Sequence, residues 1–138
     1  MKQFRVLFVC IGNSCRSQMA EGFANRYGHD VLTAESAGLA PASIIVPRTY
    51  AAMEEKNITL DGHFPKGLET FNLRKFDLVV NISGRSLPKS SAKNVDTWEV
   101  PDPIAMGPEE FRVVRDDLER RVMRLILDQR QKQSSPGR

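Results

Sequence analysis

Short apolar runs alternate along this chain with segments whose apolar residues recur at helical spacing. The run FRVLFV, at residues 4–9, is typical of a buried strand in a parallel sheet. Residues 31–38 and 76–83 predict two more strands, and residues 97–103 hold a short fourth strand. Strands that are separated by helices favour parallel pairing. We therefore predict an α/β fold, a three-layer sandwich with a four-stranded parallel sheet and helices on both of its faces.

Three helices are expected among and after these strands. The first has apolar residues at helical spacing and stops near Gly28: Met19, Ala20, Phe23, Ala24 and Tyr27. The second covers residues 48–56, and three of its side chains are predicted to face inward: Tyr50, Ala51 and Met53. The third begins at Pro108, because proline suits a first turn, and it carries a long apolar stripe: Phe111, Val114, Leu118, Val122 and Leu125.

The chain is predicted to form one domain followed by a short tail. Its 138 residues match the size of a single ordinary domain. The closing segment QRQKQSSPGR contains no apolar side chain, so residues 129–138 are predicted to be a disordered tail behind a domain of residues 1–128.

Composition excludes several classes of function. The net charge of +3 is mild and its lysines and arginines are scattered, which argues against a nucleic-acid partner. No apolar run approaches the roughly 20 residues that cross a bilayer, which argues against a membrane partner. The chain has only two cysteines, too few for a disulfide framework, so we expect a reducing, cytoplasmic location.

Both cysteines lie in one stretch, VCIGNSCRSQMAEG, which follows the first predicted strand. Five residues separate Cys10 from Arg16, and a loop of this length can point successive backbone N–H groups inward at a helix N-terminus. Such a loop binds an oxyanion, and seven residues are predicted to do so: Ile11, Gly12, Asn13, Ser14, Cys15, Arg16 and Ser17. Gly12 and Asn13 suit the sharp bends that the loop requires.

The side chains of this loop predict covalent chemistry at Cys10. The helix N-terminus and the N–H groups favour the thiolate of Cys10, and the hydroxyl of Ser17 can donate to the same sulfur. Arg16 can grip two oxygens of a tetrahedral oxyanion at once. The alternative is that Cys10 is a buried, inert residue at the end of a strand.

This stretch resembles the signature loop of the low-molecular-weight protein tyrosine phosphatase superfamily, which also contains thioredoxin-coupled arsenate reductases. That loop reads roughly V-C-x-G-N-x-C-R-S-x-M-A-E, and this chain fills each fixed place. The resemblance continues through ESAG at residues 35–38, FDLVV at residues 76–80, VPDP at residues 100–103 and the final helix. It covers the first 125 or so residues.

The resemblance implies a phosphate loop after the first strand and a division of roles in the site. Cys10 would be the nucleophile, Arg16 would stabilise the oxyanion, and Asp102 would be the general acid. Asn13 and Ser36 match positions that brace the phosphate loop, and Ser17 also supports it. The spacing in DGHFPKG differs from that of members with a bracing histidine, so His63 is assigned no role. We expect no metal and no cofactor, because the chain offers no cluster of ligands.

Three functions remain open. The first is a phosphatase that hydrolyses phosphate monoesters, including those of a phosphoprotein, through a cysteinyl-phosphate. The second is an arsenate reductase; it would need an external thiol, because the segment after the third strand has none of the cysteines that the reductase branch uses there. Two departures weaken the phosphotyrosine hypothesis: no tyrosine follows Asp102, and the third strand ends in Ile82 and Ser83 rather than in an acidic residue. The third function is a non-catalytic module that binds phosphate or arsenate.

The second cysteine predicts a redox switch. Cys10 and Cys15 lie in one tight loop, and a reactive thiolate is the first to be oxidised to a sulfenic acid that a neighbouring thiol can capture. We expect a reversible disulfide between Cys10 and Cys15.

Overall fold

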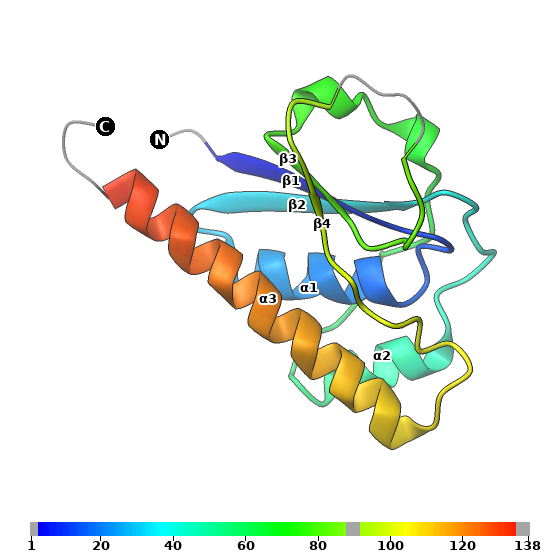
Figure 1. The fold of residues 1–138 in the computed structure, drawn as a ribbon. Helices are drawn as coiled ribbons and strands as arrows, with labels where there is room; N and C mark the ends of the chain where they lie inside the picture. The colour runs from blue at the N-terminus through cyan, green and yellow to red at the C-terminus, as the bar shows by residue number, and fades with distance from the viewer. Residues whose placement is uncertain (1–2, 88–91, 135–138) are drawn as a thin grey trace.

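The computed structural model describes residues 3–87 and 92–134, which form a four-stranded parallel sheet with helices around it (Figure 1). The strands lie in the order β2-β1-β3-β4. The elements in chain order are β1 (Phe4–Cys10), α1 (Arg16–Gly28), β2 (Leu32–Gly38), α2 (Pro47–Glu54), η1 (Leu68–Thr70), η2 (Leu73–Lys75), β3 (Leu78–Asn81), β4 (Val95–Thr97) and α3 (Pro108–Ser134).

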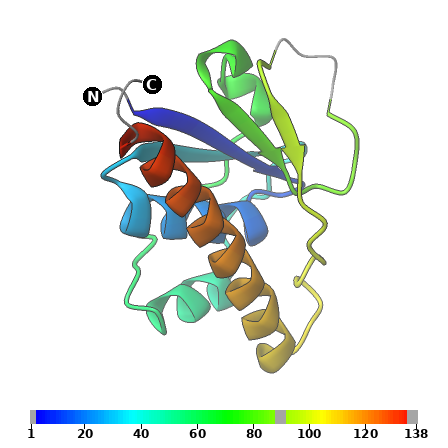
Figure 2. The ribbon, with the colours of Figure 1, turned by 60° about the vertical axis from the view of Figure 1, so that its left-hand side comes forward.

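Helices cover both faces of the sheet, as the sequence predicted. The side chains of β1 alternate between two buried clusters, with Val6 and Phe8 in one and Leu7 and Val9 in the other. The first cluster packs against α1, α2 and α3. The second is covered by the short 3-10 helices η1 and η2 and their flanking loops, which lie on the opposite side of the sheet (Figures 1 and 2). The α/β sandwich is therefore confirmed.

The sheet register brings the carboxyl ends of its central strands to one edge. Cys10, the last residue of β1, pairs with Gly38 of β2, and Val9 pairs with Asn81 of β3. In parallel sheets ligands bind beyond this edge. The loops that follow β1, β2 and β3 therefore meet where the cysteine stretch leaves the sheet.

The fourth strand lies earlier than predicted. It comprises Val95–Thr97 and pairs with Val79–Asn81, whereas residues 98–103 continue without strand pairing. The apolar pattern of that segment has another cause, because Trp98 and Val100 pack into the core from an extended connection to α3. In α2, Ala52 rather than Ala51 is buried, together with Met53.

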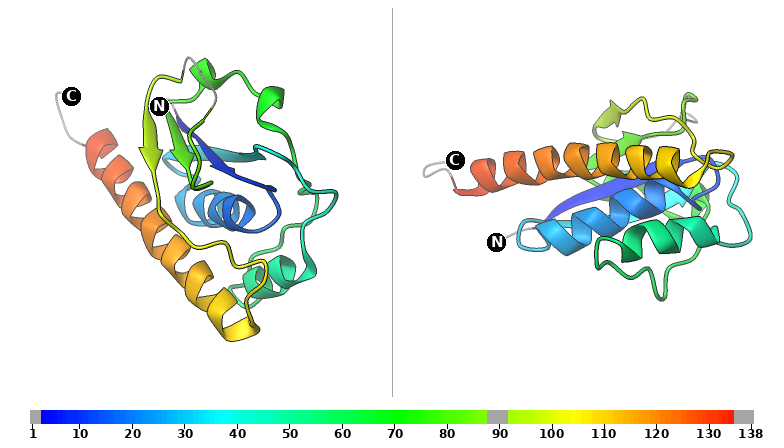
Figure 3. Two further views of the ribbon diagram at one scale, coloured as in Figure 1. Left: turned by 45° about the vertical axis from the view of Figure 1, so that its right-hand side comes forward. Right: turned by 90° about the horizontal axis from the view of Figure 1, so that it is seen from below.

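The last helix extends beyond the predicted domain end. The prediction of a disordered tail is wrong for residues 129–134, which continue α3, and residues 135–138 lie outside the described residues. Polar contacts stabilise these turns: Arg130 binds Asp30, and Gln133 donates to the carbonyl of Val31. The last buried apolar residue of α3 is Ile126 instead of Leu125, and Gln129 continues the buried face. Figure 3 shows α3 running along α1. None of the helices in the described part of the chain is long and apolar enough to span a membrane.

Candidate active site

The loop between β1 and α1 presents backbone N–H groups to its interior. The carbonyl oxygens of Cys10, Ile11 and Gly12 accept hydrogen bonds of 2.8–3.0 Å from the N–H groups of residues 39, 40 and 42, so they point toward the chain that follows β2. In a trans peptide the next N–H points the opposite way. The N–H groups of residues 11–13 therefore point away from that segment, and the N–H of Asn13 lies 3.3 Å from the Cys10 sulfur.

Two backbone features allow this curvature. Asn13 is fully buried and has a left-handed φ of 53°, which asparagine tolerates better than most residues. Gly38 of β2 lies directly against the loop, since a Cβ there would be 2.5 Å from the Ile11 carbonyl oxygen. The glycine of the ESAG segment is thus explained by close packing. α1 begins at Arg16 without a side-chain cap, which leaves its first N–H groups for an anion.

The Cys10 sulfur is held by two donors from the loop and α1. Its Sγ is 2.7 Å from the Ser17 hydroxyl oxygen, and the Cys10 residue is only 3% exposed. Asn13 Nδ2 donates to the same hydroxyl at 2.8 Å. Because Ser17 Oγ accepts that bond, its proton is directed toward the sulfur. These contacts fix the position of the sulfur within the loop.

Arg16 lies between the loop and the segment that carries Asp102. Its Nη1 donates to the carbonyl oxygens of Ile82 at 2.8 Å and Val100 at 2.9 Å, which fixes the buried guanidinium at the carboxyl edge of the sheet. Its Nη2 lies 3.6 Å from Asp102 Oδ2. The side chain of Asp102 is 46% exposed, and its Oδ1 accepts the N–H of Ile104 at 3.1 Å. A half-exposed carboxyl group therefore lies beside a fixed arginine at this edge of the sheet.

A buried glutamine clamps the loop, and sequence reasoning missed it. Gln18 Nε2 lies 3.1 Å from both the carbonyl and the side-chain oxygen of Asn13, and 3.2 Å from the carbonyl of Phe64. The N–H of Lys66 donates to the same Asn13 side-chain oxygen at 2.8 Å. These bonds fix the orientation of the Asn13 amide and so direct its Nδ2 to Ser17. The only sequence signal was a polar residue on the buried side of α1.

Among the described residues, the hydroxyl of Ser36 bonds to α1 rather than to the loop. It is fully buried and donates to Glu21 of α1. Glu21 in turn lies 3.7 Å from His63 Nδ1, which is 3.0 Å from Gln18 Oε1. Gln18 uses its Nε2 for the bonds described above, so His63 carries its proton on Nδ1 and donates to Gln18. Ser36 and His63 are thus linked to the loop through Glu21 and Gln18, and His63 gains a place that the sequence did not assign.

The side chain of Cys15 is buried in the hydrophobic core. It is 4% exposed and packs in the same core cluster as Cys10, and burial raises the pKa of its thiol. Thr49 of α2 donates to the neighbouring Ser14 carbonyl at 2.8 Å, which ties α2 to the loop. Both cysteines are free thiols. Cys15 is therefore a neutral thiol close in sequence to Cys10.

The structure thus brings together Cys10, Asn13 and Ser17, and separately Arg16 and Asp102. Within residues 3–87 and 92–134, no group of three or more histidine, cysteine, aspartate and glutamate side chains is arranged as a metal site. The chemistry that this geometry supports is nucleophilic attack by sulfur on an oxyanion.

Comparisons with known proteins agree with this geometry. Residues 5–135 match the family model described as low molecular weight phosphotyrosine protein phosphatase. The chain is 37% identical over 126 residues to a glutaredoxin arsenate reductase of Synechocystis, covering 88% of this chain and 95% of that protein. It is 34% identical over 123 residues to an arsenate reductase of Bacillus cereus, covering 86% of this chain and 91% of that one.

A solved structure of an arsenate reductase in the phosphate binding state superposes with a TM-score of 0.84 and 35% identity, over 94% of this chain and 99% of that chain. A low molecular weight protein tyrosine phosphatase from T. tengcongensis superposes with a TM-score of 0.79 and 25% identity, over 91% and 99% of the two chains.

Proposed function

Because this chain belongs to the low molecular weight phosphotyrosine protein phosphatase family, we propose that it is an arsenate reductase that takes its electrons from an external thiol. The observation that carries the proposal is the position of the Cys10 sulfur. It lies 2.7 Å from the Ser17 hydroxyl oxygen, within a loop whose N–H groups point away from the surrounding chain. The relatives named arsenate reductase, which align over most of their length, support arsenate as the oxyanion.

In the first step, the Cys10 thiolate attacks arsenic and one oxygen leaves. Arg16 and the loop N–H groups stabilise the charge that develops on the remaining oxygens. Asp102 gives its proton to the departing oxygen, which leaves as water or hydroxide. The product is a covalent adduct between Cys10 and arsenic, still in its pentavalent state. We call the loop of residues 10–17 the cradle. The similar structure in the phosphate binding state supports a cradle that fits a tetrahedral anion, and phosphate and arsenate are near-isosteres.

The second step needs electrons from outside the chain. A thiolate attacks Cys10 Sγ, a disulfide bond forms, and the sulfur–arsenic bond breaks with its electron pair remaining on arsenic. Arsenic is thereby reduced from As(V) to As(III) and leaves as arsenite, and a second external thiol then releases Cys10 by disulfide exchange. The chain has two cysteines in 138 residues, and Cys15 is buried, so no third protein thiol is available for a relay. A reducing, cytoplasmic location would supply such thiols.

A phosphatase is the second candidate function, favoured by the description of the matching family. The same residues would act on a phosphate monoester: Cys10 would form a cysteinyl-phosphate, and Asp102 would protonate the leaving oxygen and then activate water. The sequence led to this hypothesis first. The relatives named arsenate reductase favour the reductase over it.

One pair of assays separates these functions. The purified protein is given arsenate with glutathione, dithiothreitol or reduced glutaredoxin, and arsenite is measured; p-nitrophenyl phosphate is tested separately. We expect thiol-dependent arsenite formation, and we expect Arg16→Lys to reduce it severely, because an ammonium group cannot form the bidentate grip. Hydrolysis of p-nitrophenyl phosphate without arsenite formation would establish the phosphatase instead. Binding of phosphate without either activity would indicate a non-catalytic module.

A further inference from the structure

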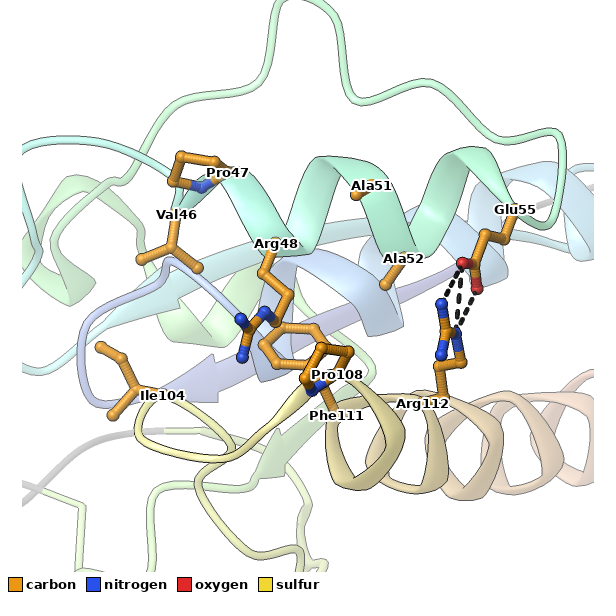
Figure 4. A pocket seen from close by; sticks show the side chains of 10 residues that line it. All are labelled: Val46, Pro47, Arg48, Ala51, Ala52, Glu55, Ile104, Pro108, Phe111 and Arg112. Atoms are coloured by element: carbon orange, nitrogen blue, oxygen red, sulfur yellow. Dashed lines mark hydrogen bonds and ion pairs between the residues drawn. The ribbon is translucent and has the colours of Figure 1, made fainter.

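We propose that the pocket between α2 and the start of α3 binds the external thiol, in the form of a small peptide thiol that carries carboxylates. This inference rests on the proposed reductase function. The pocket has a volume of about 610 Å³, which lies within the range of roughly 300–1,000 Å³ typical of small-molecule sites. Figure 4 shows α2 along one side of it and the first turns of α3, with the preceding loop, along the other.

Both walls of the pocket adjoin the active site. Ile104 forms part of one wall, and its N–H holds Asp102 Oδ1 at 3.1 Å. The other wall is α2, where Thr49 donates to the Ser14 carbonyl of the loop at 2.8 Å. Arg48 of α2 donates to the carbonyl of Met106, so it joins the two walls. The pocket therefore lies next to the segment that carries Asp102 and next to the helix that is bonded to the loop.

The charged side chains around the pocket favour a negatively charged ligand. Among the residues that the structure describes, Arg48 forms no ion pair, and its bond to Met106 leaves other N–H groups of the guanidinium for a ligand. At the other end, the carboxylate of Glu55 is shared by Arg112 and Arg115. Hydrogen bonds from Arg112, and to a smaller extent from Arg115, hold the pKa of Glu55 at about 2. The carboxylate of Glu55 therefore stays ionised and paired with these arginines. The lining thus carries excess positive charge.

Between these charged ends the lining is mostly apolar, with Val46, Ile104, Pro108 and Phe111 among its residues (Figure 4). A short peptide thiol matches this arrangement, because its methylene groups can contact the apolar walls while a carboxylate binds Arg48. Its sulfur would then attack Cys10 Sγ as the sulfur–arsenic bond breaks, with the electron pair left on arsenic.

Arg48→Gln tests the proposal kinetically, because Arg48 is not part of the cradle. We expect the KM for glutathione in arsenate reduction to rise about tenfold, which is the usual effect of losing a hydrogen bond to a charged group. The KM for the uncharged thiol 2-mercaptoethanol and the inhibition constant of inorganic phosphate should stay unchanged. Arg48→Lys should recover part of the loss. Arg120→Gln is the matched control, since this α3 side chain is 71% exposed and does not line the pocket.

A binding measurement keeps the pocket testable apart from turnover. S-methylglutathione, which cannot be oxidised to a disulfide, should bind the wild type in calorimetry and bind Arg48→Gln about tenfold more weakly. Three results would overturn the pocket proposal. The first is equal affinity of S-methylglutathione for both proteins, and the second is a rise in the KM for 2-mercaptoethanol equal to that for glutathione. The third is turnover with reduced glutaredoxin but not with glutathione. Absence of arsenite with every thiol would instead reject the proposed reductase, whatever S-methylglutathione does.

Discussion

Asp102 is proposed to act in two opposite ways. Its proton would help an oxygen to leave arsenic, whereas the charge of its carboxylate would weaken binding of the oxyanion. The carboxylate lies 3.6 Å from Arg16 Nη2 and is 46% exposed. We expect Asp102→Asn to slow formation of the Cys10–arsenic adduct by about 10²–10⁴-fold, because hydroxide is a poor leaving group without an acid. The inhibition constant of inorganic phosphate should stay equal or fall, since a negative charge beside Arg16 is removed. Single-turnover kinetics would measure the first effect; an unchanged rate would remove Asp102 from the acid role.

Cys15 has no role in either step of the proposed reaction, yet it lies in the same buried cluster as Cys10. We expect mild peroxide to convert Cys10 to a sulfenic acid, which the Cys15 thiol then captures as a disulfide with release of water. Wild type should recover activity after reduction, Cys15→Ser should recover less, and bound phosphate should protect both proteins. Equal recovery, with no disulfide between residues 10 and 15 detected by mass spectrometry, would reject this switch.

At the residue scale, the sequence predicted contacts between residues of one segment. It did not predict contacts between residues that are far apart in the chain. The spacing of Cys10, Arg16 and Ser17 is local, so their shared loop could be inferred. Thr49 reaches Ser14 across 35 positions, and His63 reaches Gln18 across 45 positions. Nothing in the local pattern reports such contacts, because they depend on how α2 and the loop near residue 63 pack.

Among the elements, hydrogen bonds between α1 and residues 63–66 hold the loop after β1 through Gln18 and Asn13. We expect Gln18→Leu to weaken inorganic phosphate binding about tenfold, although Gln18 need not touch the anion, and to reduce the free energy of unfolding by roughly 1–3 kcal/mol. The reason is that the amide of Asn13 loses its fixed orientation. Gln133→Leu at the far end of α3 is the control and should leave phosphate affinity unchanged. Phosphate affinity that is equal in Gln18→Leu and wild type would contradict the positioning role.

The contact between α2 and α3 gives a pH dependence to stability. Arginines hold the pKa of Glu55 at about 2, below its ordinary value of 4.5, so this stabilisation is complete above about pH 4.5 and is lost as the pH falls toward 2. The stability difference between wild type and Glu55→Gln should therefore be constant near neutral pH and shrink in acid. Urea unfolding at several pH values measures it. The neighbouring Glu54→Gln should show no such trend, and an equal trend in both variants would exclude the ion pairs as its cause.

Element boundaries were predicted less well than element types. β4 lies at Val95–Thr97 because its partner β3 is short, and the apolar residues after it are core contacts rather than strand positions. α3 runs to Ser134 because Arg130 and Gln133 find polar partners near β2. Apolar periodicity cannot indicate turns that are held by polar contacts alone.

At the scale of the whole molecule, the alternation of strands and helices was sufficient to predict the sheet and its binding edge. The oxyanion was not predictable in the same way, because phosphate and arsenate present nearly the same shape to one cradle. The proposed choice of arsenate rests on the relatives named arsenate reductase. The pocket beside α2 is the site proposed above for the external thiol.

The most direct test of this account is arsenite production by Cys10→Ser, measured beside wild type with arsenate and glutathione. We expect wild type to release arsenite with one oxidised glutathione for each arsenite. Cys10→Ser should release none, while it still binds inorganic phosphate through Arg16 and the loop N–H groups. Arsenite release by Cys10→Ser at the wild-type rate would contradict the covalent mechanism, and its absence in wild type with every thiol would contradict the reductase itself.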